Sequence, residues 1–285
     1  MPARSVAKAT AFAINTSYSP ITSAYSSNRL RFWNRVAAVL HLIQFVFMAV
    51  ASVAVPKFRE FQLRMTYVYF EKTPGVVGLV NAVGDAGTIR VAPLVALFFL
   101  LSALFQGATT IDVLGLNAVY NADLDRSINR FRWYEYAISS SVMICIIAMF
   151  VGVSDICALV CIFSINACMN LFGLLMEVEN SERQGTLTWR PFFFGCLAGV
   201  PPWISVFTSL FAGSGPPGFV YAIFFSYLVM FCLFPLNMVL QYLRVGRWAD
   251  YRFGEYIYIL LSIVAKSLLG WLVFGGLNQP NSYSE

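Results

Sequence analysis

The stretch EYIYILLSIVAKSLLGWLVFGG, residues 255–276, decides the fold class. An α-helix needs about 20 mostly apolar residues to cross the hydrocarbon core of a bilayer, and this stretch is long enough. It nevertheless carries Lys266 near its centre. A lysine at that depth costs roughly 2.5–3.5 kcal/mol on insertion scales, so it calls for a partner or a function.

Six further stretches of similar length and apolar character precede this one. The chain is 59% hydrophobic and 12% charged, whereas a soluble domain carries about 25% charged residues. The sequence therefore predicts an all-α membrane protein, in which residues 31–278 form one bundle of seven transmembrane helices. The expected spans are residues 36–55, 91–111, 130–153, 156–177, 191–213, 217–243 and 255–276.

The connection over residues 56–90 differs from the short connections elsewhere. It contains the strand-like run TYVYF, a Pro-Gly turn signal and a Val-rich run, a pattern typical of a β-hairpin lying on the membrane surface. Residues 1–30 and 279–285 are predicted to be tails. The first tail lacks the apolar core of a signal peptide; its acid-poor, Ser/Ala-rich composition indicates a flexible segment and also fits an organelle transit peptide.

The distribution of lysine and arginine predicts the orientation. Of the 19 such residues, thirteen lie on the side of the N-terminus and five on the other, all of these in the hairpin connection. The positive-inside rule therefore places the N-terminus in the cytoplasm, and the hairpin and the C-terminus outside. Because topology explains the net charge of +5, no nucleic-acid partner is predicted.

The six cysteines all fall inside apolar stretches, so no disulfide framework is predicted and we expect small core residues. With one histidine in the chain, no metal site is expected. No catalytic residues and no enzymatic activity are predicted.

The carboxylate that matches Lys266 in depth is Glu135, in RFRWYEYAISSSVMI (residues 130–144). We expect the third helix to begin near Asp123 and Asp125, because DLDRSINRFRW has an amphipathic helical pattern. Glu135 would then lie about 10–12 residues into the helix, or about 15–18 Å. An opposite charge is what a buried lysine requires, and a plain structural ion pair is one interpretation.

The other interpretation is a covalent cofactor site. Tyr258, Ser262 and Lys266 are spaced i, i+4, i+8 and share one helix face. A desolvated lysine reacts readily with a carbonyl, and the iminium that forms needs a counterion such as Glu135.

Two strings carry a resemblance to a known family. RWYEYAISSSVMI (132–144) and LLSIVAKSLLGW (260–271) resemble helices three and seven of heliorhodopsins, retinal-binding rhodopsins of inverted topology that include viral members. The resemblance covers nearly the whole chain after residue 30. It implies that Lys266 holds all-trans retinal as a Schiff base, with Glu135 as its counterion.

Further roles follow from the resemblance alone. It places Ser262, Ser140 and Asn166 near the Schiff base or the counterion. Along the polyene it places Tyr136, Met143 and Trp203, for which ordinary core packing is the alternative. A polar or proton-conducting role is implied for four residues: His41, Arg132, Glu177 and Glu255. The family's second histidine is absent, and Gln106 stands near its position.

The resemblance also implies a homodimer in the lipid bilayer, formed through the hairpin, and an unspecified signalling partner. Beyond Glu135 the third helix offers no carboxylate until Asp155, so a photosensor with a slow photocycle is favoured over a pump. Light-gated passive proton transport is the alternative. A receptor coupled to G proteins would place the N-terminus outside, and a cofactor-free transporter would use Lys266 and Glu135 only as a salt bridge.

Overall fold

The computed structural model describes residues 26–72, 75, 78–112, 114–182, 187–212 and 215–279. Most of the two predicted tails, residues 1–25 and 280–285, lies outside this range. Seven described helices are long and apolar enough to cross a membrane, which confirms the seven-helix prediction. They are α1 (Ser27–Ala54), α3 (Val91–Ala108), α5 (Arg130–Phe150), α6 (Ile156–Glu182), α7 (Arg190–Ala212), α8 (Gly218–Tyr242) and α9 (Tyr251–Leu277).

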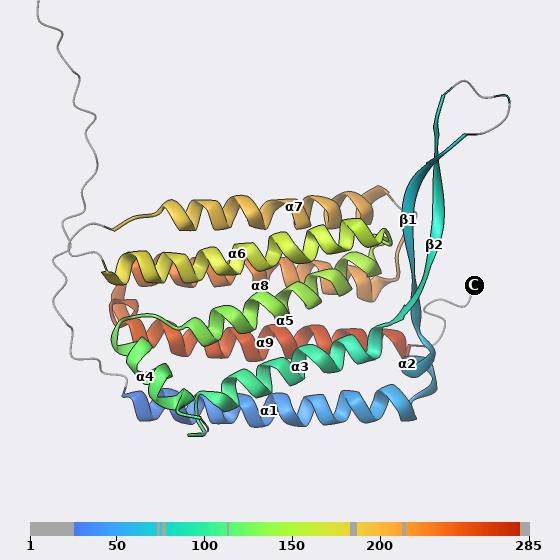
Figure 1. The fold of residues 1–285 in the computed structure, drawn as a ribbon. Coiled ribbons are helices and arrows are strands. Elements are labelled where there is room, and N and C mark those ends of the chain that lie inside the picture. Colours follow the sequence, from blue (N-terminus) through green and yellow to red (C-terminus); the bar gives the residue numbers. More distant parts are fainter. Residues whose placement is uncertain are drawn as a thin grey trace, which may run out of the picture.

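The remaining elements lie at the two ends of this bundle. The short helix α4 (Leu116–Asp125) covers one end, which we call the α4 end, and the 3₁₀-helix η1 (Gly246–Ala249) precedes α9 (Figure 1). The helix α2 (Pro56–Glu60) and the strands β1 (Gln62–Glu71) and β2 (Val80–Arg90) lie at the opposite, hairpin end. The chain begins its first span at the α4 end, and successive spans alternate in direction.

Helix α5 runs through the centre of the bundle. It packs against α3, α6, α7 and α8, and fourteen of its residues are buried. Side chains on several of its faces therefore point into protein rather than into lipid.

Two helix starts differ from the prediction. Helix α1 begins at Ser27, where the side chain of Ser26 accepts a hydrogen bond from the Arg29 N–H. The third span begins at Arg130, not near Asp123 and Asp125, because those two residues end the separate helix α4. Ser127 then adopts a φ of +60°, which breaks the helix, and Asn129 caps the new one by accepting from the Arg132 N–H at 3.1 Å. Glu135 is therefore the sixth residue of its helix.

The predicted hairpin is confirmed, and it starts after α2. Its strands pair antiparallel from Gln62 opposite Arg90 to Glu71 opposite Val80, with a bulge at Met65/Thr66. The hairpin is attached to the start of α6, where the Thr66 N–H donates to the Ser154 carbonyl at 2.8 Å and the Val68 N–H donates to Asp155 Oδ2 at 3.2 Å. From there it runs across the helix axes and projects beyond the side of the bundle where α7 lies (Figure 1).

The expectation that the cysteines are core residues is wrong. Five of the six are exposed, and Cys145 is partly buried. Lipid tails are apolar, so a thiol on a membrane helix is tolerated equally well on the outside and in the core.

A buried lysine between two cavities

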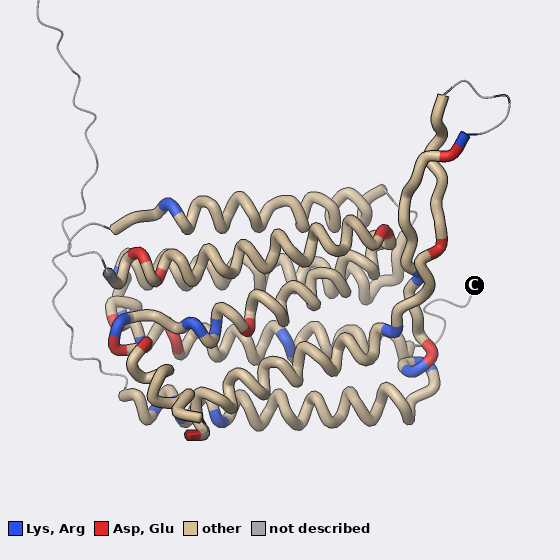
Figure 2. Tube along the Cα trace, in the orientation of Figure 1, with Lys and Arg blue, Asp and Glu red and all other residues tan. Residues whose placement is uncertain are grey.

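The buried ion pair predicted from the sequence is present. Lys266 Nζ lies 3.2 Å from Glu135 Oε1, and both residues are almost completely buried. Lys266 also donates to Ser262 Oγ at 2.8 Å, which shows that its side chain points back along α9 toward the α4 end. Ser102 on α3 donates to Glu135 Oε1 at 2.7 Å. Apart from the charged groups at the two ends, few charges lie along the bundle (Figure 2).

The two residues meet although their helices are not in the expected register. Asn129 donates to Glu255 Oε2 at 2.6 Å, so the start of α5 is level with the second turn of α9. From this level Glu135 is about 9 Å along α5 and Lys266 about 16 Å along α9, at 1.5 Å per residue. The long lysine side chain, directed toward the α4 end, covers most of the difference.

A large cavity lies beside Lys266. Its volume is about 630 Å³, and its walls, formed by α5 to α9, are mostly apolar. Tyr136, Met143 and Trp203 line it together with Lys266, and Lys266 Nζ lies 5.0 Å from the centre of the Tyr136 ring. Pockets for small ligands typically measure about 300–1,000 Å³ and are mainly apolar, so this cavity suits a large apolar molecule attached at its lysine end.

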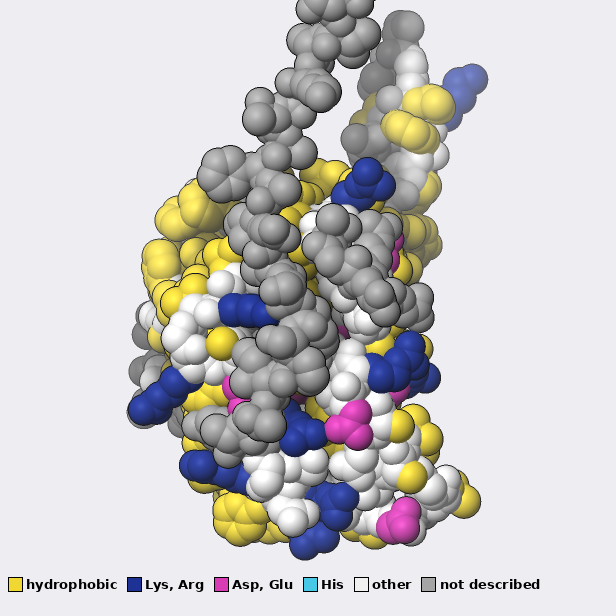
Figure 3. Space-filling view, turned by 90° about the vertical axis from the view of Figure 1, so that its left-hand side faces the viewer, with side chains coloured by type: hydrophobic (Ala, Val, Ile, Leu, Met, Phe, Trp, Pro, Cys, Tyr) yellow, Lys and Arg dark blue, Asp and Glu magenta, His cyan; other side chains and the backbone are white. Residues whose placement is uncertain are grey.

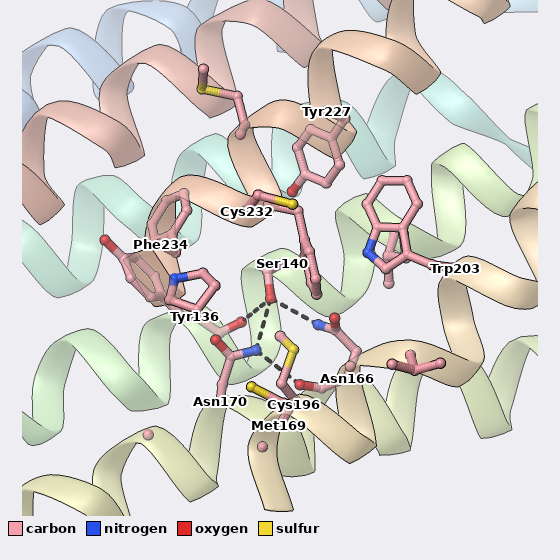
Figure 4. Close-up of a pocket in the computed structure, with 18 of the residues that line it drawn as sticks. Tyr136, Ser140, Asn166, Met169, Asn170, Cys196, Trp203, Tyr227, Cys232 and Phe234 are labelled. Carbon is pink, nitrogen blue, oxygen red and sulfur yellow. Dashed lines mark hydrogen bonds between the residues drawn. The ribbon is translucent and has the colours of Figure 1, made fainter. Parts of the chain in front are cut away.

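Part of the cavity wall is polar. Asn166 and Asn170 on α6 both donate to Ser140 Oγ, at 2.8 and 3.0 Å, and Ser140 donates to the Tyr136 carbonyl (Figure 4). Trp203 and Tyr227 lie apart from this group in the same view. The three side chains thus satisfy one another and present a fixed polar patch to an otherwise apolar cavity.

A second polar group lies at the α4 end. Arg132 forms ion pairs with Glu177 and, at 3.1 Å, with Glu255. Its guanidinium also lies over the ring of Tyr258, 3.7 Å from the ring centre. All of these side chains are buried. Three of the four residues for which the resemblance implies a polar or proton-conducting role, Arg132, Glu177 and Glu255, are therefore in contact and buried.

His41 is fully buried on α1, and neither ring nitrogen has a hydrogen-bond partner among the described residues. Gln44, one turn further along, donates to Ser267 Oγ at 2.7 Å. Ser267 follows Lys266 on α9, so His41 is buried one helical turn from a side chain that reaches this part of α9, and its ring centre lies 6.0 Å from that of Phe99.

Three polar contacts of the site were missed by sequence reasoning. Ser102, Asn129 and Asn170 each bond to a predicted site residue. Each is a polar residue in or next to an apolar stretch, and this is the signal that could have identified them. Within the described parts of the chain, no group of histidine, cysteine, aspartate and glutamate could hold a metal ion.

A buried amine, a carboxylate beside it and an apolar cavity within seven spans define a membrane protein of the rhodopsin class. Within that class, the heliorhodopsin family model matches residues 30–277, and the chain belongs to the heliorhodopsin family. Heliorhodopsins are retinal-based light-sensing membrane proteins. A comparison with curated proteins gave no match.

Proposed function

We propose that Lys266 binds all-trans retinal as a protonated Schiff base with Glu135 as the counterion, and that the protein is a photosensor. One observation carries the proposal: Lys266 lies 3.2 Å from Glu135 and lines an apolar cavity of about 630 Å³. Retinal would supply the absorption of visible light and the photoisomerisation of a polyene, which no amino-acid side chain provides.

The residues of the chain position and balance this group. Glu135 offsets the positive charge on Lys266 Nζ, while Ser102 and Ser262 orient the two charged side chains. Tyr136, Met143 and Trp203 shape the cavity and keep water away from the polyene.

A sensory role is supported by the one-sided distribution of buried polar groups. Toward the hairpin end, the interior beyond Lys266 is filled by one apolar cluster that includes Phe99, Ile147 and Val273. A pump needs ionisable relays on both sides of the switch. The described residues supply them only toward the α4 end.

The proposed orientation has the α4 end in the cytoplasm. Lysine and arginine side chains are spread over this end of the molecule (Figure 3), as the positive-inside rule requires for a cytoplasmic face. The hairpin then lies outside, where its exposed Tyr67, Tyr69 and Phe70 offer a surface for a homodimer.

Passive, light-gated proton transport is the second candidate. It is favoured by the buried carboxylates Glu177 and Glu255, which lie between the lysine and the α4 end. Photocurrents in a voltage-clamped cell that reverse with the sign of the voltage would support this candidate, and their absence would support the sensor.

Retinal binding is tested by adding all-trans retinal to the purified apoprotein and recording the visible spectrum. We expect a band well to the red of free retinal, because a protonated Schiff base is charged. Lys266→Ala should form no such band, whereas Lys57→Ala, which changes an exposed lysine on α2, should form it fully. A red-shifted pigment in Lys266→Ala would refute the proposed attachment site.

A further inference from the structure

A second, much smaller cavity lies on the other side of the ion pair. Its volume is about 30 Å³, and it reaches from Glu135 toward the α4 end of the bundle. Most of the residues that line it carry polar side chains, which is not true of the large cavity, although carbon atoms still form the larger part of the small cavity's surface. The polar lining residues are Asn34, Gln106, Thr109, Tyr120, Asn129, Arg132, Glu135 and Glu255.

Several polar atoms of this wall are buried without a protein partner. Among the described residues, Gln106 Oε1, Arg132 Nε and Nη1, and Glu255 Oε1 make no hydrogen bond. Buried polar atoms are nearly always paired, and an internal water is the usual partner where the protein offers none. One water needs about 10–15 Å³ of such space, so the cavity has room for about two water molecules.

The two carboxylates beside Arg132 are not equivalent. Glu177 accepts from Arg132 Nη2, from the Asn129 N–H at 2.8 Å and from Tyr251 Oη at 3.4 Å. Glu255 accepts from Asn129 through Oε2, while its Oε1 lies 3.1 Å from Arg132 Nη2 without a hydrogen bond. Of the two, Glu255 lines the cavity. It is therefore the carboxylate that cavity water can reach.

The net charge of the group formed by Arg132, Glu177 and Glu255 allows it to take up one proton. Arg132 provides one positive charge against the two carboxylates, so the group carries one negative charge in excess when both are ionised. Taking up a proton makes the group neutral in a region where an unpaired charge is costly. Before the transfer, the third buried carboxylate, Glu135, is already balanced by Lys266, so the excess negative charge belongs to the group around Arg132.

We propose that Glu255 is the group that stores the proton released from Lys266 Nζ during the photocycle. The proton passes from Nζ to Glu135, and Glu135 gives it through the cavity water to Glu255 Oε1. At the end of this transfer Nζ is neutral, Glu135 is again a carboxylate and Glu255 is a neutral carboxylic acid. The return of the same proton restores the starting state without net transport. This inference rests on the proposed retinal site.

Tyr120 closes the cavity on the side of α4. Its hydroxyl accepts from Asn34 Nδ2 at 3.0 Å. Burial, and next the negative charge of Glu255, raise the pKa of Tyr120 above its usual value. The phenol therefore stays neutral and can donate to cavity water without competing for the proton.

Infrared difference spectroscopy tests the destination of the proton. In the pigment we expect a carboxylic-acid C=O band that rises as the deprotonated chromophore accumulates and shifts in D₂O. The band should disappear in Glu255→Gln and remain in the matched variant Glu177→Gln. Persistence of the band in Glu255→Gln would overturn the proposal, as would a loss confined to Glu177→Gln or the absence of any such band. The last outcome would favour a non-carboxylate acceptor such as His41.

A second measurement tests the cavity water without retinal. Radiolytic hydroxyl labelling of the apoprotein modifies side chains that lie next to trapped water. We expect labelling of Tyr120, which lines the cavity, and none of the equally inaccessible Phe98 and Phe99. Equal protection of all three would show a dry cavity and refute the water path.

Gln106→Leu connects the two measurements. It replaces the amide with an apolar group of similar size, so labelling of Tyr120 should fall and chromophore deprotonation should slow by about tenfold, as expected for loss of one relay step. Unchanged labelling and an unchanged rate would contradict the proposal. If no variant and no wild-type protein binds retinal, the proposed function fails, whereas the labelling result still decides whether the cavity holds water.

Discussion

The two halves of the bundle differ sharply in what they bury. Between Lys266 and the α4 end, the interior holds Arg132, Glu177 and Glu255 together with many buried amides and hydroxyls. Between Lys266 and the hairpin end, it holds one continuous apolar cluster from all seven spans. The boundary between the halves passes through the Lys266–Glu135 pair.

This difference separates two tasks within one bundle. The apolar half needs no specific partners and is stabilised by close packing, which also keeps water and ions from Lys266 on that side. The polar half is stable only where each buried charge has its partner, and in return it offers hydrated sites for a proton. A substitution in the polar half and one in the apolar half should therefore destabilise the protein for different reasons.

The largest effect is expected from Arg132→Gln. This variant leaves Glu177 and Glu255 buried without their cation, and removing one partner of a buried ion pair costs about 3–5 kcal/mol. The lost contact with the Tyr258 ring adds to this cost. Unfolding in mixed SDS and detergent micelles measures the loss.

The control for Arg132→Gln is Arg64→Gln, which removes an exposed ion pair with Asp85 in the hairpin. Such surface pairs contribute about 0–1 kcal/mol. If the two variants lowered the free energy of unfolding equally, the polar half would not depend on paired charges as we describe.

A smaller effect is expected from a polar substitution in the apolar half. Ile147 is fully buried on α5, and Ile147→Ser removes its contacts and leaves a void, at a cost of about 2–4 kcal/mol. Ser139, two turns earlier on the same helix, is equally buried, and its hydroxyl has no hydrogen-bond partner among the described residues. Ser139→Ala should change the free energy of unfolding by less than about 1 kcal/mol.

The comparison between these two α5 variants is made in the same micelles and on the apoprotein. If Ser139→Ala lowered the free energy of unfolding as much as Ile147→Ser does, the division into halves would be contradicted. Such a result would mean that the Ser139 hydroxyl makes a stabilising polar contact.

Much of this arrangement could be predicted from the sequence. The length of each apolar stretch identified the seven spans, and the scarcity of buried charge singled out Lys266 and Glu135 as partners. The strand-like run before a Pro-Gly turn identified the hairpin. These signals are strong because hydrocarbon penalises charge and unpaired backbone heavily.

Other features of the fold and the site could not be predicted from the sequence, and the physical reasons are clear. Apolar residues suit both lipid and core, so the exposed cysteines could not be told from buried ones. The break between α4 and α5 depends on the backbone of Ser127 and the cap at Asn129, within a stretch whose pattern is helical throughout. The bonds of Ser102 and Asn170 depend on which helices are neighbours.

The smallest effect is expected where the apolar half meets the hairpin. Asp155 caps α6 by accepting from the Ala158 N–H at 2.8 Å, and its second oxygen accepts from the Val68 N–H at 3.2 Å. Loss of an N-cap costs about 1 kcal/mol, so Asp155→Ala should lower the free energy of unfolding by about that amount. Hydrogen exchange at Val68 should become faster, whereas Asp155→Asn, which keeps one acceptor oxygen, should retain most of the cap.

The absorption of the pigment should be the same in both variants, since neither touches the polar half. A spectral shift in Asp155→Ala would mean that the hairpin end is coupled to Lys266 through the apolar cluster, and the two halves would then not act separately.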